Sequence, residues 1–132
     1  MTQLTKNFNS FEFACKDGTP VPYRYKENVK NLAENLQVLR DYYKMPVHIN
    51  SGYRTKSHNK AVGGSPNSQH LLGKAADITI RNKTPKQVAR TIKKLISQGK
   101  MREGGIGLYN GFVHYDIRGY AARWDYSSIF NF

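Results

Sequence analysis

The chain has 132 residues, a single cysteine and a formal net charge of +12. This length suits one domain with its own hydrophobic core, and we expect that domain to span residues 1–132. The lone Cys15 excludes an internal disulfide framework and a four-cysteine structural zinc site, and we expect it to be a small buried apolar residue. No apolar run approaches the roughly 20 residues of a membrane-spanning helix.

The positive charge predicts a polyanionic neighbour, because basic surfaces attract anions over long range. The lysines and arginines are scattered along the chain without a recognised nucleic-acid-binding motif, so no specific nucleic acid is expected as a partner. A basic surface that is merely solvated accounts for the same composition. Residues 1–10 are polar and lack the apolar segment of a signal peptide, which predicts synthesis in the cytoplasm.

The first half of the chain predicts one long helix and one short strand. Residues 27–43 have the apolar stripe of an amphipathic helix, and Pro46 ends it. Residues 47–50 are typical of a strand. Residues 55–69 are rich in Ser, Asn, Gly and Lys and predict a long irregular loop. The helical stripe consists of Val29, Leu32, Leu36, Leu39 and Tyr43.

The second half begins with a predicted strand and a second helix. Residues 75–80 alternate as a strand does, which directs Asp77 to one face. Thr84-Pro85 is a helix start, with Thr as the cap and Pro in the first turn, and Gly99 ends this helix.

A β-hairpin follows. Asn110-Gly111, the strongest short hairpin signal, joins two strand-like runs at 104–109 and 112–117. In the second run a period of two puts His114 and Asp116 on one face. The elements together predict an α+β fold, an antiparallel sheet with two main helices packed on it, with no element assigned after residue 118.

His70, Asp77 and His114 have the composition of a catalytic metal site. Zinc sites that do chemistry take three ligands from His, Asp, Glu or Cys and leave a fourth position for water. An aspartate on a strand of apolar residues is costly to bury without a partner or a cation, which singles out Asp77. A histidine taken alone is more often structural, and His48 and His58 stay in that class.

Four motifs occur in a distinctive order: Ser51-Gly52-Tyr53-Arg54, Ser68-x-His70-x-x-Gly73-x-Ala75-x-Asp77, Gly105-x-Gly107-x-Tyr109 and Val113-His114-x-Asp116. Together they resemble the zinc D-alanyl-D-alanine carboxypeptidase family of peptidoglycan peptidases, which shares its fold with the hedgehog signalling domain. The resemblance implies one Zn²⁺ per chain, held by His70, Asp77 and His114. It also implies hydrolysis of peptide bonds in the peptidoglycan stem peptide.

The resemblance implies that Arg54 binds or polarises the substrate, and the alternative is a structural ion pair. Family members often carry a Glu or His base two or three residues before the last zinc-binding histidine. Those positions are Gly111 and Phe112 here, which cannot carry protons. Asp116 is therefore the preferred general base, although it can instead orient a ligand histidine, and Glu103 is next.

Three further residues are expected to bind substrate. Ser68 can hydrogen-bond near the ligand loop, while Tyr109 and Trp124 can wall the cleft. For the two aromatic residues, ordinary core packing is the alternative. Ser68 is not expected to act as a nucleophile, because the metal uses the histidines and the acid that would activate it.

The resemblance leaves several functions open. The enzyme would act at the bacterial cell wall as a carboxypeptidase that trims the terminal D-alanine or as an endopeptidase that cuts cross-links. It would be a phage endolysin delivered by a holin-type partner, or a bacterial wall-remodelling enzyme, and a monomer. The anionic envelope would account for the positive charge. The competing hypothesis is a zinc-containing cell-wall binding module without activity.

Overall fold

The computed structural model describes residues 2–127. Its helical elements are η1 (Ser10–Phe13), η2 (Tyr23–Tyr25), α1 (Lys26–Tyr43), α2 (Lys56–Ala61), η3 (Gln69–Leu72) and α3 (Pro85–Ser97), where η marks a 3₁₀ helix. The strands are β1 (Val47–Ser51), β2 (Ala75–Ile80), β3 (Gly105–Tyr109), β4 (Phe112–Asp116) and β5 (Ala122–Asp125). No helix in the described part of the chain is long and apolar enough to cross a membrane.

The five strands form one sheet in the order β1-β2-β4-β3-β5. The pairs β1–β2, β2–β4 and β3–β4 are antiparallel, whereas β5 pairs with β3 in parallel. The predicted α+β fold is confirmed. The parallel edge strand lies in the segment after residue 118, for which no element was predicted, and only residues up to 127 of that segment are described.

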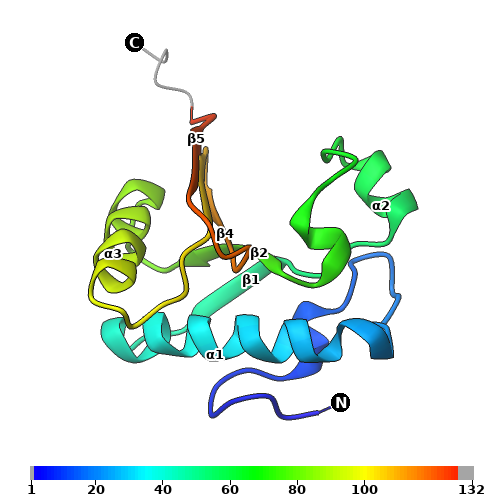
Figure 1. Cartoon of the computed structure of the whole chain (residues 1–132), viewed down its shortest axis with the longest axis horizontal. Coiled ribbons are helices and arrows are strands. Elements are labelled where there is room, and N and C mark those ends of the chain that lie inside the picture. The colour runs from blue at the N-terminus through cyan, green and yellow to red at the C-terminus, as the bar shows by residue number, and fades with distance from the viewer. Residues whose placement is uncertain (1, 128–132) are drawn as a thin grey trace.

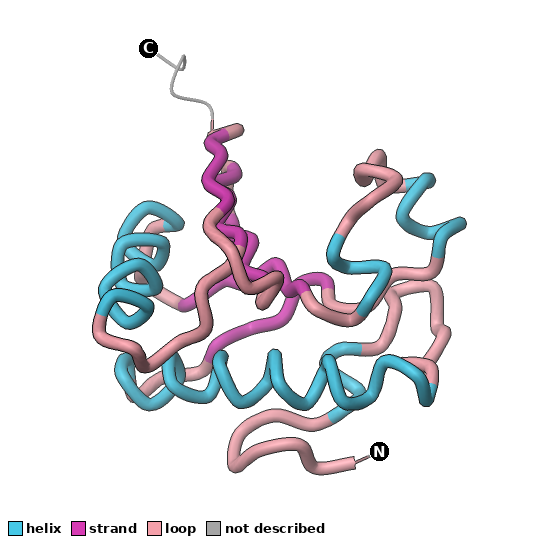
Figure 2. Tube along the Cα trace, in the orientation of Figure 1, coloured by secondary structure: helices cyan, strands magenta, loops and turns pink. Residues whose placement is uncertain are grey.

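The two long helices, α1 and α3, cover one side of the twisted sheet, and the short α2 and η3 stand apart from them (Figures 1 and 2). One apolar cluster joins these helices to the sheet, and it includes Leu36 and Leu39 of α1, Ile92 of α3, Ile78 of β2 and Tyr115 of β4. This face of the sheet is core. The opposite face is therefore the one that can carry a site.

Strand register places two of the predicted ligands next to each other. Asp77 of β2 pairs directly with His114 of β4, and Gly107 of β3 lies opposite His114 on the other side. Since side chains alternate along a strand, Asp77 and His114 point away from the face that buries Ile78, Val113 and Tyr115. A shift of one residue between β2 and β4 would separate the pair.

The two main helices were predicted to within one or two residues at either end. Thr84 caps α3 with a reciprocal pair of hydrogen bonds to Gln87, the capping box, and Pro85 is the first helical residue. The other helix, α1, ends at Tyr43, and its C-cap residue Lys44 has a left-handed conformation with φ of 56°.

The prediction of an uninterrupted loop over 55–69 is wrong. Residues Lys56–Ala61 form α2, because the Thr55 hydroxyl accepts a hydrogen bond from the backbone N–H of His58 at 3.1 Å and so caps the helix. A six-residue helix carries too short an apolar pattern to stand out from its polar composition. The loop proper begins after α2 and leads to η3, which carries His70.

Candidate metal centre and cleft

A cleft of about 890 Å³ opens on the side of the sheet away from α1 and α3. One wall is formed by the segment from Val62 to Gln69, and the facing wall by aromatic residues of β3 to β5 and the loops beside them, including Tyr109, Trp124 and Tyr126. His70, Asp77 and His114 all line the cleft. The structure thus brings the three predicted ligands to one accessible place.

The three side chains converge closely. The Nε2 atom of His70 lies 3.2 Å from Oδ1 of Asp77, and Nδ1 of His114 lies 3.3 Å from that same oxygen. All three residues are buried, with relative exposures of 2%, 6% and 6%. Each can offer one ligand atom, and these atoms lie within 4.8 Å of one another.

The far side of each imidazole is held by an acceptor. Nδ1 of His70 lies 2.7 Å from the Gly52 carbonyl oxygen, and Nε2 of His114 lies 2.7 Å from Oδ2 of Asp116. A carbonyl or a carboxylate can only accept, so both of these ring nitrogens carry the proton. When both rings are neutral, as metal ligands must be, the inner nitrogens therefore present lone pairs to Asp77. Three acceptors that face one another fit a cation, and the outer hydrogen bonds are those that usually orient metal-binding histidines.

The three groups shift one another's pKa values in the site without a cation. Burial alone would raise the pKa of Asp77, but its close contacts with the His114 and His70 rings outweigh burial and hold that pKa well below its usual range. Burial lowers the pKa of His70, which keeps its ring neutral. The pKa of His114 is raised, because hydrogen bonds to Asp116 and Asp77 outweigh the effect of burial. A bound cation would oppose that protonation, since metal ligands must be deprotonated.

Asp116 is enclosed, and the cleft does not reach it. It has 0% exposure and accepts hydrogen bonds from His114 Nε2, from the backbone N–H groups of Gly105 and Arg118, and from the Arg118 guanidinium at 2.8 and 2.9 Å. Burial raises the pKa of Asp116, yet the hydrogen bonds from His114 and Arg118 lower it well below the ordinary range. Of the two roles open to Asp116, this geometry favours orientation of His114.

Two glycines of the third motif make room for these partners. A Cβ on Gly105 would collide with the Asp116 carboxylate, and one on Gly107 would collide with the Trp124 indole. Arg118, which clamps Asp116, was not predicted as a site residue. Its position two residues after that aspartate was the available signal, because alternate residues of an extended segment share a face, although β4 itself ends at Asp116.

Arg54 forms the ion pair that was the alternative to its predicted substrate role, and it also lies at the cleft. Its Nη2 lies 3.0 Å from Oδ2 of Asp77, the carboxylate oxygen that does not face the histidines, and its side chain also lines the cleft. Nε donates to the Ser51 hydroxyl at 3.1 Å and Nη1 to the Asn59 side-chain oxygen at 3.2 Å. These contacts fix the guanidinium beside the ligand carboxylate.

The predicted substrate-binding aromatics form a connected wall. The Trp124 indole N–H donates to the Tyr109 hydroxyl at 2.9 Å, and the Trp124 ring lies 4.9 Å from that of His114. Tyr109 stacks on Phe112, with ring centroids 4.5 Å apart. Tyr109 and Trp124 both line the cleft, so they adjoin the ligands and also support one another.

The remaining two candidates lie in different places. Ser68 lines the cleft and caps η3, where its hydroxyl accepts from the His70 backbone N–H at 3.2 Å. Glu103 pairs with Arg123 at 2.8 Å and is not among the residues that line the cleft. Among the described residues that do line it, Asp77 is the only carboxylate.

Comparison with known proteins places the chain in a family. The family model described as Peptidase M15 matches residues 4–116, which include all three candidate ligands. The chain belongs to the peptidase M15 family. The resemblance carried by the four motifs is thereby confirmed for the M15 family. A search of curated proteins finds no significant match.

Among solved structures, the M15 chain is similar to the Serratia marcescens L-Ala D-Glu endopeptidase ChiX. The two are 15% identical, with a TM-score of 0.49, over 74% of this chain and 88% of that chain.

The two roles of Asp116 can be separated by substitution. We expect Asp116→Asn to weaken zinc binding by about 10-fold to 100-fold, because the amide is a poorer acceptor for His114 Nε2–H and leaves that ring loosely oriented. Competition with a chelating dye measures the affinity, and activity should return in excess zinc. Asp125→Asn, on the exposed end of β5, is the matched control. Normal zinc affinity with a rate that excess zinc does not restore would contradict orientation and make Asp116 the base.

Proposed function

We propose that this M15 chain is a zinc-dependent peptidase that hydrolyses peptide bonds in the stem peptides of bacterial peptidoglycan. The observation that carries the proposal is the convergence of His70 Nε2, Asp77 Oδ1 and His114 Nδ1 within 4.8 Å, at a cleft of a peptidase-family chain. We further propose that one zinc ion binds per chain at these three atoms. A fourth position toward the cleft would then remain for water or substrate.

A zinc ion held by these residues would polarise the scissile carbonyl and would lower the pKa of a bound water towards roughly 7. The chain's own residues hold the ligands for this chemistry. Gly52 and Asp116 fix the two imidazole rings, and Arg54 holds the outer oxygen of Asp77. With Asp116 enclosed, we assign the uptake of the water proton to solvent in the open cleft.

Tyr109 supplies a hydrogen-bond donor at the wall of the cleft. Its oxygen already accepts the Trp124 indole N–H, so its own proton must be directed to a different acceptor. We assign that acceptor as the carbonyl oxygen of the scissile bond, on which negative charge develops in the transition state. Burial raises the pKa of Tyr109, which keeps the hydroxyl protonated and able to donate at neutral pH.

The charge of the cleft suits an anionic substrate. Arg54 and Arg118 line it, whereas Asp77 is the single carboxylate among its described lining residues. Stem peptides carry free carboxylates, which such a cleft can accept through charge-assisted hydrogen bonds. A carboxypeptidase would use one of these arginines for the terminal carboxylate, and an endopeptidase for an internal one. Ser68 and Trp124 would contact the same peptide from opposite walls.

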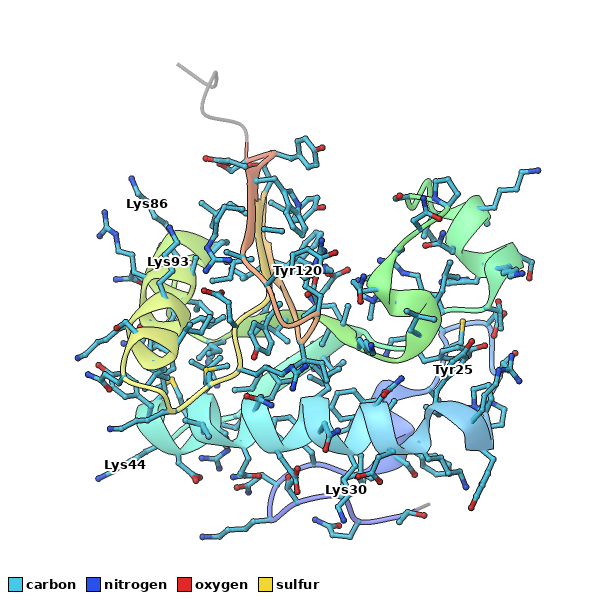
Figure 3. The ribbon with its side chains drawn as sticks, in the orientation of Figure 1. Tyr25, Lys30, Lys44, Lys86, Lys93 and Tyr120 are labelled. Carbon is cyan, nitrogen blue, oxygen red and sulfur yellow. The ribbon has the colours of Figure 1, made fainter. Side chains whose placement is uncertain are left out.

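The outer surface is basic as well. Lys30 and Lys44 at α1 and Lys86 and Lys93 on α3 project away from the protein (Figure 3). We propose that this charge holds the protein on the anionic cell envelope, where the substrate lies, with no specific nucleic acid as a partner. The proposed setting is a phage endolysin or a bacterial wall-remodelling enzyme, acting as a monomer.

The function can be tested with defined muropeptides and mass spectrometry. We expect purified protein to contain about one zinc at the cleft site and to shorten a muropeptide by a mass that identifies the bond cut. Removal of the metal by a chelator should abolish cleavage, and added zinc should restore it. His70→Ala should lose both this zinc and the activity, whereas His48→Ala, on the exposed side of β1, should keep both. Zinc retained at the cleft without cleavage of any muropeptide would favour the inactive binding module.

The role of Tyr109 has its own test. Removal of one donor to a developing oxyanion typically lowers kcat by about 100-fold to 1,000-fold, and we expect Tyr109→Phe to do so with little change in KM. Tyr23→Phe is the matched control, since Tyr23 is 84% exposed. An unchanged kcat in Tyr109→Phe would limit Tyr109 to packing.

A further inference from the structure

A second group of metal-ligating side chains lies outside the cleft. It consists of Cys15, Asp17 and His58, which can each offer one ligand atom, and these atoms lie within 4.8 Å of one another. The first two follow η1, and the third is in the first turns of α2. Sequence alone assigns Cys15 to the core and His58 to a structural role, because nothing in their spacing shows that the fold brings them together.

Thr55 organises the group. Its hydroxyl donates to Oδ2 of Asp17 at 2.7 Å and accepts from the His58 backbone N–H at 3.1 Å, so it ties the turn at Asp17 to the start of α2. Oδ1 of Asp17 accepts from the Thr19 backbone N–H at 2.9 Å. A carboxylate offers about four lone-pair positions, so both oxygens retain capacity to bind a cation. These contacts fix the Asp17 carboxylate and the backbone at His58, and Sγ of Cys15 lies 3.9 Å from the same Thr55 hydroxyl.

Burial and ionisation suit a metal site at the surface. Cys15 has 3% exposure, Asp17 is exposed and His58 is half-buried, so an ion can enter from solvent and still reach the sulfur. Hydrogen bonds from the Thr19 backbone and from Thr55 hold the pKa of Asp17 well below its usual range. The carboxylate is therefore charged at neutral pH.

We propose that Cys15, Asp17 and His58 form a second metal site, which takes a divalent cation of the zinc class. Thiolate, imidazole and carboxylate are the three ligand types that zinc accepts, and a thiolate excludes hard cations such as Mg²⁺ and Ca²⁺. Binding replaces the thiol proton of Cys15, which is released to solvent. Water completes the coordination.

The second site is connected to the cleft through α2. Asn59 follows His58 in the chain and accepts the hydrogen bond from Nη1 of Arg54. An ion at Cys15, Asp17 and His58 would fix α2 against the turn at Asp17, and α2 holds the guanidinium beside Asp77. Because the ion binds the folded chain, it also stabilises that state against unfolding.

Cobalt distinguishes the two sites by their ligands. The whole chain, stripped of metal and kept reduced by a phosphine, is titrated with Co²⁺ and followed by absorption spectroscopy. We expect two equivalents to bind, one of which produces a near-ultraviolet sulfur-to-cobalt charge-transfer band. The cleft site has no sulfur ligand and cannot give this band. Cys15→Ser and His58→Ala should each lose one equivalent and the band, whereas His70→Ala should lose an equivalent and keep the band.

A titration that stops at one equivalent, or that reaches two without the charge-transfer band, would overturn the second site. A band that persists in His58→Ala would also overturn it, since the sulfur would then bind cobalt without the proposed histidine. Asp17→Asn should weaken cobalt binding at this second site, because the amide is a poorer metal ligand than the carboxylate. Asp41→Asn, on the exposed surface of α1, is the matched control. The result does not depend on the proposed function, because the band reports on Cys15 whether or not the cleft is catalytic.

Discussion

Three hydrogen-bond acceptors face one another at the cleft, and the arrangement of the surrounding residues follows from them. His70, Asp77 and His114 are buried, and the contacts behind each ring direct its lone pair inward toward the carboxylate. Burying an ionised carboxylate costs several kcal/mol unless it is paired or hydrogen-bonded. A divalent cation between the three groups would remove the repulsion among their lone pairs.

The neighbouring residues hold this arrangement from behind. Asp116 accepts from His114 and is itself clamped by Arg118 and by the Gly105 backbone, so the ring has little freedom to turn. Arg54 holds the outer oxygen of Asp77 and is held in turn by α2. The same residues that complete the polar network leave one side of the three acceptors open to the cleft. A site preorganised in this way needs little rearrangement when substrate binds.

Much of this could be predicted from the sequence. The stripe of α1, the capping box of α3 and the turn at Asn110-Gly111 each carry their own local signal, and the candidate ligands Asp77 and His114 lie on strands that were predicted. The parallel pairing of β5 with β3 could not be predicted, because it depends on a contact between segments rather than on a local pattern. The short helix α2 was not predicted either. Its only local signal is the capping residue Thr55, which is weak in a polar segment.

The same limit applies to the finer chemistry of the site. The two-residue alternation of side chains along β4 correctly predicts that His114 and Asp116 share one face. It does not predict the five hydrogen bonds that enclose the aspartate. That enclosure depends on Arg118, two residues further along the chain, and on Gly105, which only the folded sheet brings to the carboxylate. The grouping of Cys15 with His58 is likewise a property of the tertiary fold.

Anomalous diffraction at the zinc absorption edge tests the central claim most directly. Crystals of protein loaded with zinc should show an anomalous peak between His70 Nε2, Asp77 Oδ1 and His114 Nδ1, at about 2.0–2.2 Å from each. Arg54 should remain on the outer oxygen of Asp77, and Asp116 on Nε2 of His114. Zinc-loaded crystals of active enzyme without a peak at that point would contradict the account.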